Sequence, residues 1–143
     1  MAGSEAERGS GLTTDFELVS PEKLLVSEPA EMVVVPGTEG DFGAMPRHAP
    51  MITAVRPGVI DVYRGGKIES RIFVAGGFAE VTATRISVLA EEAIPLGELT
   101  GEIAQARIAQ AKEDLTAASS DHARGLATRR LAVAEAMLRA VQH

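Results

Sequence analysis

The sequence predicts a β + α fold, in which an N-terminal antiparallel β-sandwich precedes a C-terminal antiparallel two-helix hairpin. From Asp15 to about Ile94, short β-branched runs alternate with glycine, proline or charged turns, a pattern typical of antiparallel sandwiches. Residues 98–143 instead contain 12 alanines and no proline, which favours helices. The chain of 143 residues has room for one compact domain and an appendage. We therefore expect a sandwich over residues 15–95 and a helical hairpin over 98–143.

Alternation and turn residues predict eight strands in the first part. The glycines of Arg64-Gly65-Gly66-Lys67 suit a tight hairpin turn, since both can take positive φ. Pro36 is expected to end a strand, because proline cannot donate to the ladder. Phenylalanines at 16, 42, 73 and 78 are expected to add bulk to the core. The predicted strands are Phe16–Val19, Lys23–Ser27, Glu31–Val35, Met51–Val55, Gly58–Tyr63, Lys67–Ala75, Ala79–Ala83 and Arg85–Ala90.

Two helices are predicted after Gly97. The first opens at Thr100 or Glu98 and runs to about Ala118, and the polar stretch 119–121 supplies a break and an N-cap for the second. Small residues recur every seven positions at Ala104, Ala111 and Ala118, then at Ala127, Ala134 and Val141. Alanine buries little apolar area, so the hairpin is either a packed appendage or a unit able to detach.

Composition excludes several classes of function. The chain has no cysteine, so disulfides and thiolate chemistry are excluded, and its histidines at 48, 122 and 143 lack metal-ligand spacing. A net charge of −6 argues against nucleic-acid binding. No run is long enough to span a membrane, and residues 1–14 are expected to form a flexible leader. We expect no catalytic residue, no cofactor and no metal.

The segment from Val35 to Pro50 stands out as a predicted loop that is rich in glycine and proline. It also carries apolar residues, Phe42 and Met45, beside the acidic residues Glu39 and Asp41. One interpretation is a stiff contact surface for a partner. The alternative is a crossing that packs onto its own sandwich.

Four segments resemble the epsilon subunit of bacterial F-type ATP synthases. The string Glu39-Gly40-Asp41-Phe42-Gly43 followed by Pro46-Arg47-His48-Ala49-Pro50 is similar to EGE-x-G…PGHAP of that family. The other three segments match the family strings TAI-K-PG, SGG-x-x-EV and VLAD-x-A in the same order, and they are Thr53–Gly58, Ala75–Val81 and Val88–Ile94.

The resemblance implies a ten-stranded sandwich and two helices in the central stalk, at the cytoplasmic face of the bacterial inner membrane. One copy per complex would couple proton-driven rotation of the c-ring to the gamma subunit and to ATP synthesis. Carried over by position, Glu39, Gly40 and Asp41 would contact the c-ring, and His48 would face gamma.

The helices of some relatives obstruct rotation or bind ATP at a Leu/Ile-Asp-x-x-Arg-Ala motif. Here Thr100 and Ile103 replace the Asp and the Arg, so negligible ATP binding is expected. The arginines at 124, 129, 130 and 139 either contact acidic surface on the alpha or beta subunits or form a solvated helix face. The alternative function is a free-standing β-sandwich binding module with a helical oligomerisation tail, which the single Trp or Tyr residue, Tyr63, disfavours.

Overall fold

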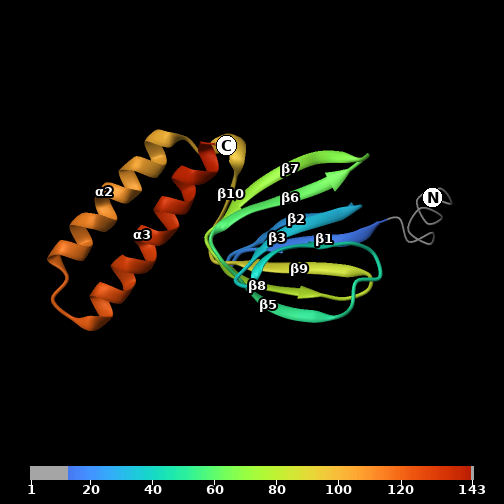
Figure 1. The fold of residues 1–143 in the computed structure, drawn as a ribbon, viewed down its shortest axis with the longest axis horizontal. Coiled ribbons are helices and arrows are strands. Elements are labelled where there is room, and N and C mark those ends of the chain that lie inside the picture. The colour runs from blue at the N-terminus through green and yellow to red at the C-terminus, as the bar shows by residue number, and fades with distance from the viewer. Residues whose placement is uncertain (1–12, 143) are drawn as a thin grey trace. The chain divides into compact units, whose positions relative to one another are not determined.

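The computed structural model describes residues 13–142, which form two compact units that divide between Ala93 and Ile94 (Figure 1). The first unit is built from strands, and the second contains two long helices. Most of the leader predicted for residues 1–14 lies outside the described residues. Thr14 is already the first residue of strand β1 and is buried, one residue before the predicted start of the sandwich.

The described residues form ten strands in one sheet. They are β1 (Thr14–Val19), β2 (Leu24–Ala30), β3 (Met32–Gly37), β4 (Gly40–Ala44), β5 (Met51–Val55), β6 (Gly58–Arg64), β7 (Lys67–Val74), β8 (Gly77–Val81), β9 (Arg85–Ala90) and β10 (Ala93–Pro95). The predicted sandwich with ten strands is confirmed. The count of eight from alternation alone was wrong, because it missed β4 and β10.

The strand order is β10-β7-β6-β3-β5-β8-β9-β1-β2, and β4 pairs with β3 beside this path. The β1–β9 pair is parallel, whereas the pairs formed by β1–β2, β3–β4, β3–β5, β3–β6, β5–β8, β6–β7 and β8–β9 are antiparallel. The inward faces of the strands enclose one aliphatic core.

Along β1, β8 and β9, alternate residues point into this core, as the period of two requires. Phe16 and Leu18 of β1 are buried there together with Ile86 and Val88 of β9. The expectation that all four phenylalanines add bulk to the core was wrong for Phe78, whose position in β8 points its ring outward. Phe16 is fully buried in this core, and the half-buried Phe42 packs against it. Phe73 is fully buried but is not part of this core, because it lies in the opposite phase of β7 from the core residues Ile72 and Val74.

Pro36 lies inside β3, so the prediction that it ends a strand was wrong. The pairing of β3 explains why proline is tolerated. The strand pairs with β6 up to Val34 and with β5 at Gly37, so Pro36 sits where β3 changes neighbour. The backbone hydrogen bonds between β3 and its neighbours are already interrupted at this change of partner. The N–H group that proline lacks therefore breaks no continuous ladder. The Pro36 carbonyl still accepts a hydrogen bond from the Arg56 N–H at 2.8 Å.

Gly77 at the start of β8 cannot be replaced without strain. Its φ is +139°, and an added Cβ would lie 1.9 Å from the Leu89 carbonyl oxygen of the paired strand β9. Only glycine lets the two backbones approach this closely. The Gly76-Gly77 pair that punctuates the sequence is therefore needed to begin the β8–β9 pairing.

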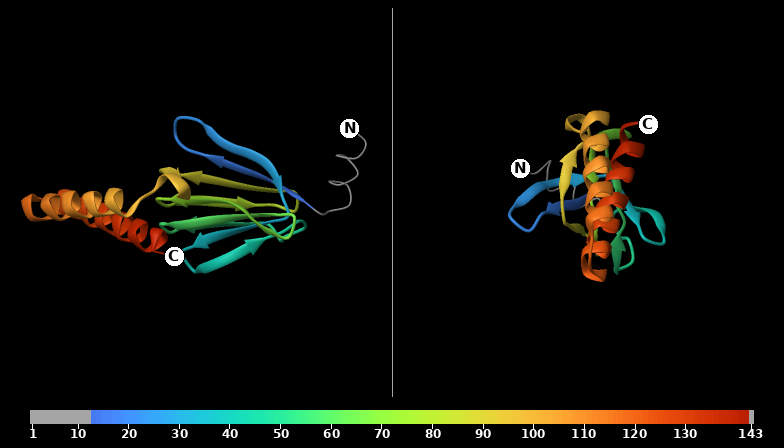
Figure 2. Two further views of the ribbon diagram at one scale, coloured as in Figure 1. Left: turned by 90° about the horizontal axis from the view of Figure 1, so that it is seen from above. Right: turned by 90° about the vertical axis from the view of Figure 1, so that its left-hand side faces the viewer.

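The second unit contains the 3₁₀ helix η1 (Leu96–Glu98) and the helices α2 (Gly101–Ala117) and α3 (Asp121–Val141). The side chain of Thr100 accepts a hydrogen bond from the Ile103 N–H, and that of Ser120 accepts one from the Ala123 N–H, so both helices begin at capping residues. Figure 2 shows α2 and α3 side by side along their length. Their buried residues are Ala104, Ala111, Ala127, Ala134, Ala136 and Met137.

Candidate functional site

Glu39, Gly40 and Asp41 form the tip of a β-hairpin, not part of a long loop. Gly37 pairs with Gly40, so only Thr38 and Glu39 form the corner between β3 and β4. Gly40 takes a φ of +130°, which allows the chain to reverse there. All three predicted contact residues are exposed. The structure thus brings them together, on a hairpin with a defined backbone.

Arg56 contacts this tip from the turn that follows β5. Its Nη1 donates to the Gly37 carbonyl at 2.6 Å, and its Nη2 donates to Asp41 Oδ1 at 2.5 Å. The Asp41 carboxylate is therefore engaged inside the chain. For Glu39, at the corner of the same hairpin, we find no side-chain partner among residues 13–142.

His48 lies away from the tip, in the connection between β4 and β5. Its ring is half-buried, with Nδ1 2.6 Å from the Ala49 carbonyl oxygen and the ring centroid 6.4 Å from that of Phe42. His48 follows the end of β4 at Ala44, and its ring reaches back to Phe42 in the middle of that strand. The two predicted contact sites therefore lie on different segments of the chain, the β3–β4 tip and the β4–β5 connection.

An apolar row crosses the outer face of five neighbouring strands. The pairings that connect its members are Ala54 with Phe78, Phe78 with Leu89, Leu89 with Val19, and Val19 with Leu24. Phe78, Leu89 and Leu24 are 60%, 55% and 56% exposed, respectively, whereas Ala54 and Val19 are half-buried. Contiguous exposed apolar side chains on a folded domain mark a surface that a partner covers.

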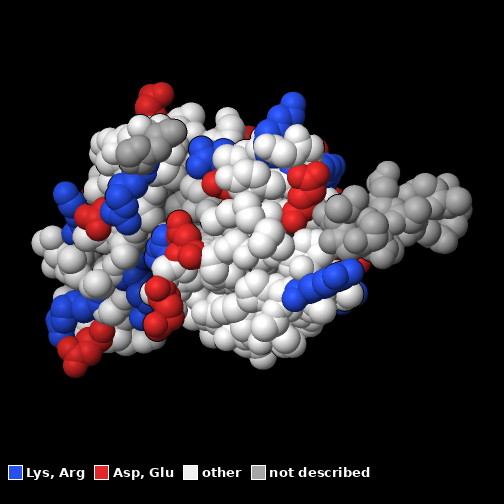
Figure 3. Space-filling view, turned by 45° about the vertical axis from the view of Figure 1, so that its right-hand side comes forward, with Lys and Arg blue, Asp and Glu red and all other residues white. Residues whose placement is uncertain are grey.

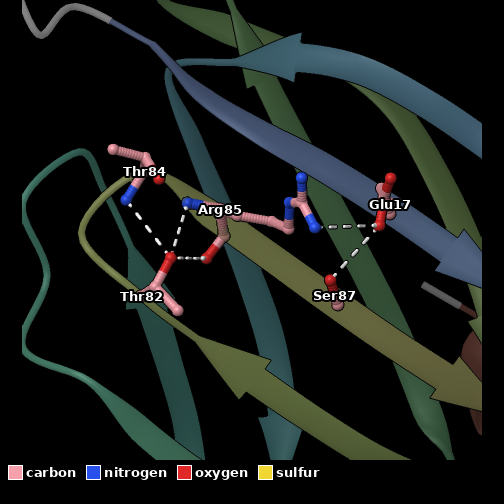
Figure 4. A network of polar contacts seen from close by, with 5 residues as sticks. All are labelled: Glu17, Thr82, Thr84, Arg85 and Ser87. Carbon is pink, nitrogen blue, oxygen red and sulfur yellow. Dashed lines mark hydrogen bonds and ion pairs between the residues drawn. The ribbon is translucent and has the colours of Figure 1, made fainter.

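Polar side chains border this row along β1 and β9 (Figure 4). Glu17 accepts a hydrogen bond from the Ser87 hydroxyl at 3.4 Å and lies 4.0 Å from an Arg85 nitrogen. Thr82 closes the β8–β9 turn, because its hydroxyl accepts hydrogen bonds from the N–H groups of Thr84 and Arg85. An apolar centre beside a polar rim is the usual anatomy of a protein interface.

The charged side chains, unlike the apolar side chains of this row, do not form one continuous feature on the face drawn in Figure 3. On the face drawn in Figure 3, acidic and basic side chains alternate and are separated by broad uncharged areas. Opposite charges within reach of each other form ion pairs, such as Arg71 with Asp61 at 2.8 Å and Arg64 with Glu69 at 3.0 Å. Charge of one sign therefore does not single out a contact surface on that face.

The apolar row was not predicted from the sequence, although a signal was present. Phe78 lies two positions from Glu80 in β8, and Leu89 lies two and four positions from Ser87 and Arg85 in β9. Phe78 and Leu89 therefore share the strand face that carries polar residues. A large apolar side chain in that phase points outward. The pairing Arg56–Asp41 had no such signal, because the residues are 15 positions apart in sequence.

The positions of the degenerate nucleotide motif lie at the start of α2. Thr100 serves as the N-cap, and Ile103 is 41% exposed with an aliphatic side chain. On α3, the side chains of Arg124, Arg129, Arg130 and Arg139 are all exposed. Arg124 contacts Asp121 within its own helix at 2.5 Å. Among residues 13–142, no group of three or more His, Asp or Glu side chains could hold a metal ion.

No helix in the described part of the chain is long and apolar enough to cross a membrane. Solved structures similar to this chain include a chain of the Euglena gracilis mitochondrial ATP synthase, with a TM-score of 0.75 and 24% identity over 92% of this chain and 82% of that one. A chain of the Tetrahymena thermophila mitochondrial ATP synthase gives a TM-score of 0.68 and 12% identity over 90% and 96%. At these identities the two matches describe the fold.

Sequence comparison is more specific. The chain is 66% identical to the ATP synthase epsilon chain of Paramagnetospirillum magneticum, over 88% of this chain and 95% of that one. It is 60% identical to the epsilon chain of Rhodospirillum rubrum, over 90% and 96%. Residues 13–96 match the family model described as ATP synthase, Delta/Epsilon chain, beta-sandwich domain. The resemblance seen in the four sequence segments is confirmed, and the chain belongs to the family of ATP synthase delta and epsilon chains.

Proposed function

We propose that the chain fastens the gamma subunit to the c-ring, so that proton-driven rotation of the ring reaches the catalytic head. As a member of its family, the chain is a central-stalk subunit and makes or breaks no bond of the substrate itself. The sandwich unit carries both contacts in this proposal. One copy per complex would work at the cytoplasmic face of the bacterial inner membrane, where a c-ring embedded in the membrane meets the stalk.

The observation that carries the proposal is the apolar row on the outer face of the sandwich. Burying the exposed 60% of Phe78 would contribute about 1–2 kcal/mol, since full burial of such a side chain contributes about 1.5–3 kcal/mol. Ile52, which is 74% exposed, lies on the same outer face of β5 as Ala54. We assign gamma to this face, which runs toward the connection that holds His48.

The c-ring contact is assigned to the β3–β4 tip. A narrow hairpin with an exposed carboxylate at its corner suits the arginine-containing polar loops that the family resemblance implies for the ring. Each exposed ion pair contributes only about 0–1 kcal/mol, so torque must be carried by the shape of the tip and by several contacts together.

The helical unit adds a regulatory role in some relatives, and the exposed arginines of α3 suit acidic surface on alpha or beta. Specific ATP binding at the start of α2 is not part of this proposal. Thr100 is engaged as a cap and Ile103 has no group that binds phosphate. Calorimetry with ATP is expected to show no stoichiometric site, and a micromolar site would contradict this assignment.

The gamma contact is tested by replacing Phe78 with Ser in the full chain. We expect binding to purified gamma to weaken by about tenfold, since a lost apolar anchor of about 1.4 kcal/mol corresponds to that factor. Ile68→Ser is the matched control, because Ile68 is also exposed but lies on β7. Equal affinity of the Phe78 variant and the native chain would refute the assignment of gamma to this face.

A further inference from the structure

We infer that Arg56 is a positioning residue that holds the β3–β4 tip in the orientation needed for the c-ring contact, and that Glu39, not Asp41, is the carboxylate presented to the ring. The inference rests on the proposed function. It separates two acidic residues that the sequence treats as equivalent, because only one of them is engaged inside the chain.

The hairpin needs an external support. Within the described sheet, β4 lies beside the main path and is paired with β3 alone. On its other side, β3 is bound near the tip by backbone hydrogen bonds from Thr38 N–H to the Ala54 carbonyl at 3.0 Å and from Arg56 N–H to the Pro36 carbonyl at 2.8 Å. These bonds fix β3 but leave the β4 side of the tip without a backbone neighbour among residues 13–142.

The guanidinium of Arg56 supplies that missing support. It donates to the carbonyl of Gly37 on β3 and to the carboxylate of Asp41 on β4, so one rigid planar group bridges both strands of the hairpin. Arg56 itself is anchored in the turn after β5, whose last residue Val55 pairs with Gly37. Lysine could not make the same contact, because it lacks the fixed fork of donors.

Stability alone does not account for this arrangement. The Arg56 and Asp41 side chains are 43% and 60% exposed, and ion pairs this exposed contribute little to the free energy of unfolding. Instead, the bridge formed by Arg56 restricts the direction in which the tip points. The bridge also has an electrostatic effect. The positive charge of Arg56 offsets that of the Asp41 carboxylate, whereas the charge of Glu39 remains available to a partner.

The test uses the native absence of cysteine, which makes a single Thr38→Cys substitution a clean site for labels and cross-links. Thr38 is exposed at the corner beside Glu39. In the full chain, a spin label at this cysteine is expected to become more mobile in the variants Arg56→Met and Arg56→Lys. In membranes that hold the assembled complex, cross-linking to a cysteine in the polar loop of the c-ring is expected to slow about fivefold, equivalent to about 1 kcal/mol.

Arg71→Met is the matched control, because Arg71 and Asp61 also form a partly exposed ion pair, with exposed fractions of 41% and 20%, on β7 and β6. It should change neither label mobility nor cross-linking. Asp41→Asn should slow cross-linking in the native background and add nothing when combined with Arg56→Met. An additional loss in that double variant would show that Asp41 meets the ring directly, which would overturn the inference.

The same experiment separates this inference from the proposed function. Glu39→Gln should lower ATP-driven proton pumping both in the native background and in the R56M variant. If the cysteine at position 38 cross-links to the ring equally well in those two backgrounds, the positioning role is refuted and the c-ring contact stands. If no cross-link forms in the native background, the proposed contact itself is refuted.

Discussion

The two units of this chain reach a folded state with different side chains. The sandwich core contains Phe16, Leu18, Ile60 and Ile86, all essentially inaccessible to solvent. Five of the six buried residues in the two long helices are alanines, and Met137 is the sixth. Burial of a large apolar side chain contributes about 1.5–3 kcal/mol, whereas burial of a single carbon group contributes about 0.8 kcal/mol.

This difference indicates that the two units have different roles. The proposed contacts with gamma and with the c-ring both lie on the sandwich, where a dense core keeps the paired strands in register. The helical unit has little apolar area to lose on opening, so its helices should open before the sandwich does. A rotor subunit needs a stiff coupling element, and an accessory unit of low stability is compatible with regulation.

The largest effect should come from Phe16→Ala. Removing this fully buried ring should lower the free energy of unfolding by about 3–5 kcal/mol, measured by denaturant titration of the full chain. Phe78→Ala is the comparator, because it removes the same side chain from an exposed position and should cost less than about 1 kcal/mol. Similar losses for both variants would mean that the sandwich core is not where the stability resides.

A smaller effect is expected in the helices from Met137→Ala, at about 2–3 kcal/mol. The other buried residues of the two helices are alanines, so Met137 is their one large buried side chain. Hydrogen exchange of the full chain should show faster exchange for amides of α2 and α3 only. Equal acceleration in β1 and β9 would show that the two units unfold together, and the comparison between them would fail.

The cap of α3 offers a sharper test. Ser120→Ala removes the acceptor for the Ala123 N–H and should lower helix stability by about 1 kcal/mol. Ser119→Ala, one residue earlier in the same turn, is the control and should be close to neutral. Exchange of the first-turn amides of α3 reports the effect, and equal behaviour of the two variants would argue against a capping role.

The smallest expected change is a gain. Gly125 lies inside α3, and a Cβ added there would meet Arg129 Nη1 at 3.7 Å, an ordinary contact. Gly125→Ala should raise helix stability by about 0.5–1 kcal/mol, because alanine loses less backbone entropy. Circular dichroism during thermal unfolding would detect it, and a lower melting temperature would point to a crowded site.

The β-branched runs and the turn residues between them were sufficient to predict most of the strands of the sandwich. β4 was missed because its sequence, Gly-Asp-Phe-Gly-Ala, has two glycines and no β-branched residue. β10 has only three residues, which is too short for a periodic signal. The helix caps at Thr100 and Ser120 were predictable, since capping is local chemistry.

The candidate site was predictable only in part. The resemblance gave the positions of Glu39, Gly40 and Asp41, and the structure gathers them on one hairpin. Neither the resemblance nor alternation indicated that Arg56 engages one of the two carboxylates, because that contact depends on how β3 and β5 pair. The apolar row likewise exists only once five strands are in register.

The parallel pairing of β1 with β9 also has a consequence for biosynthesis. It places Phe16 beside Ile86, and β2 lies at the end of the described strand order with β1 as its neighbour. The first hairpin to leave the ribosome therefore cannot pair with the rest of the sheet until β9, which ends at Ala90, has been made. Completion of this domain is thus expected to be a late event in synthesis, with early exposure of an apolar hairpin that cellular chaperones could shield.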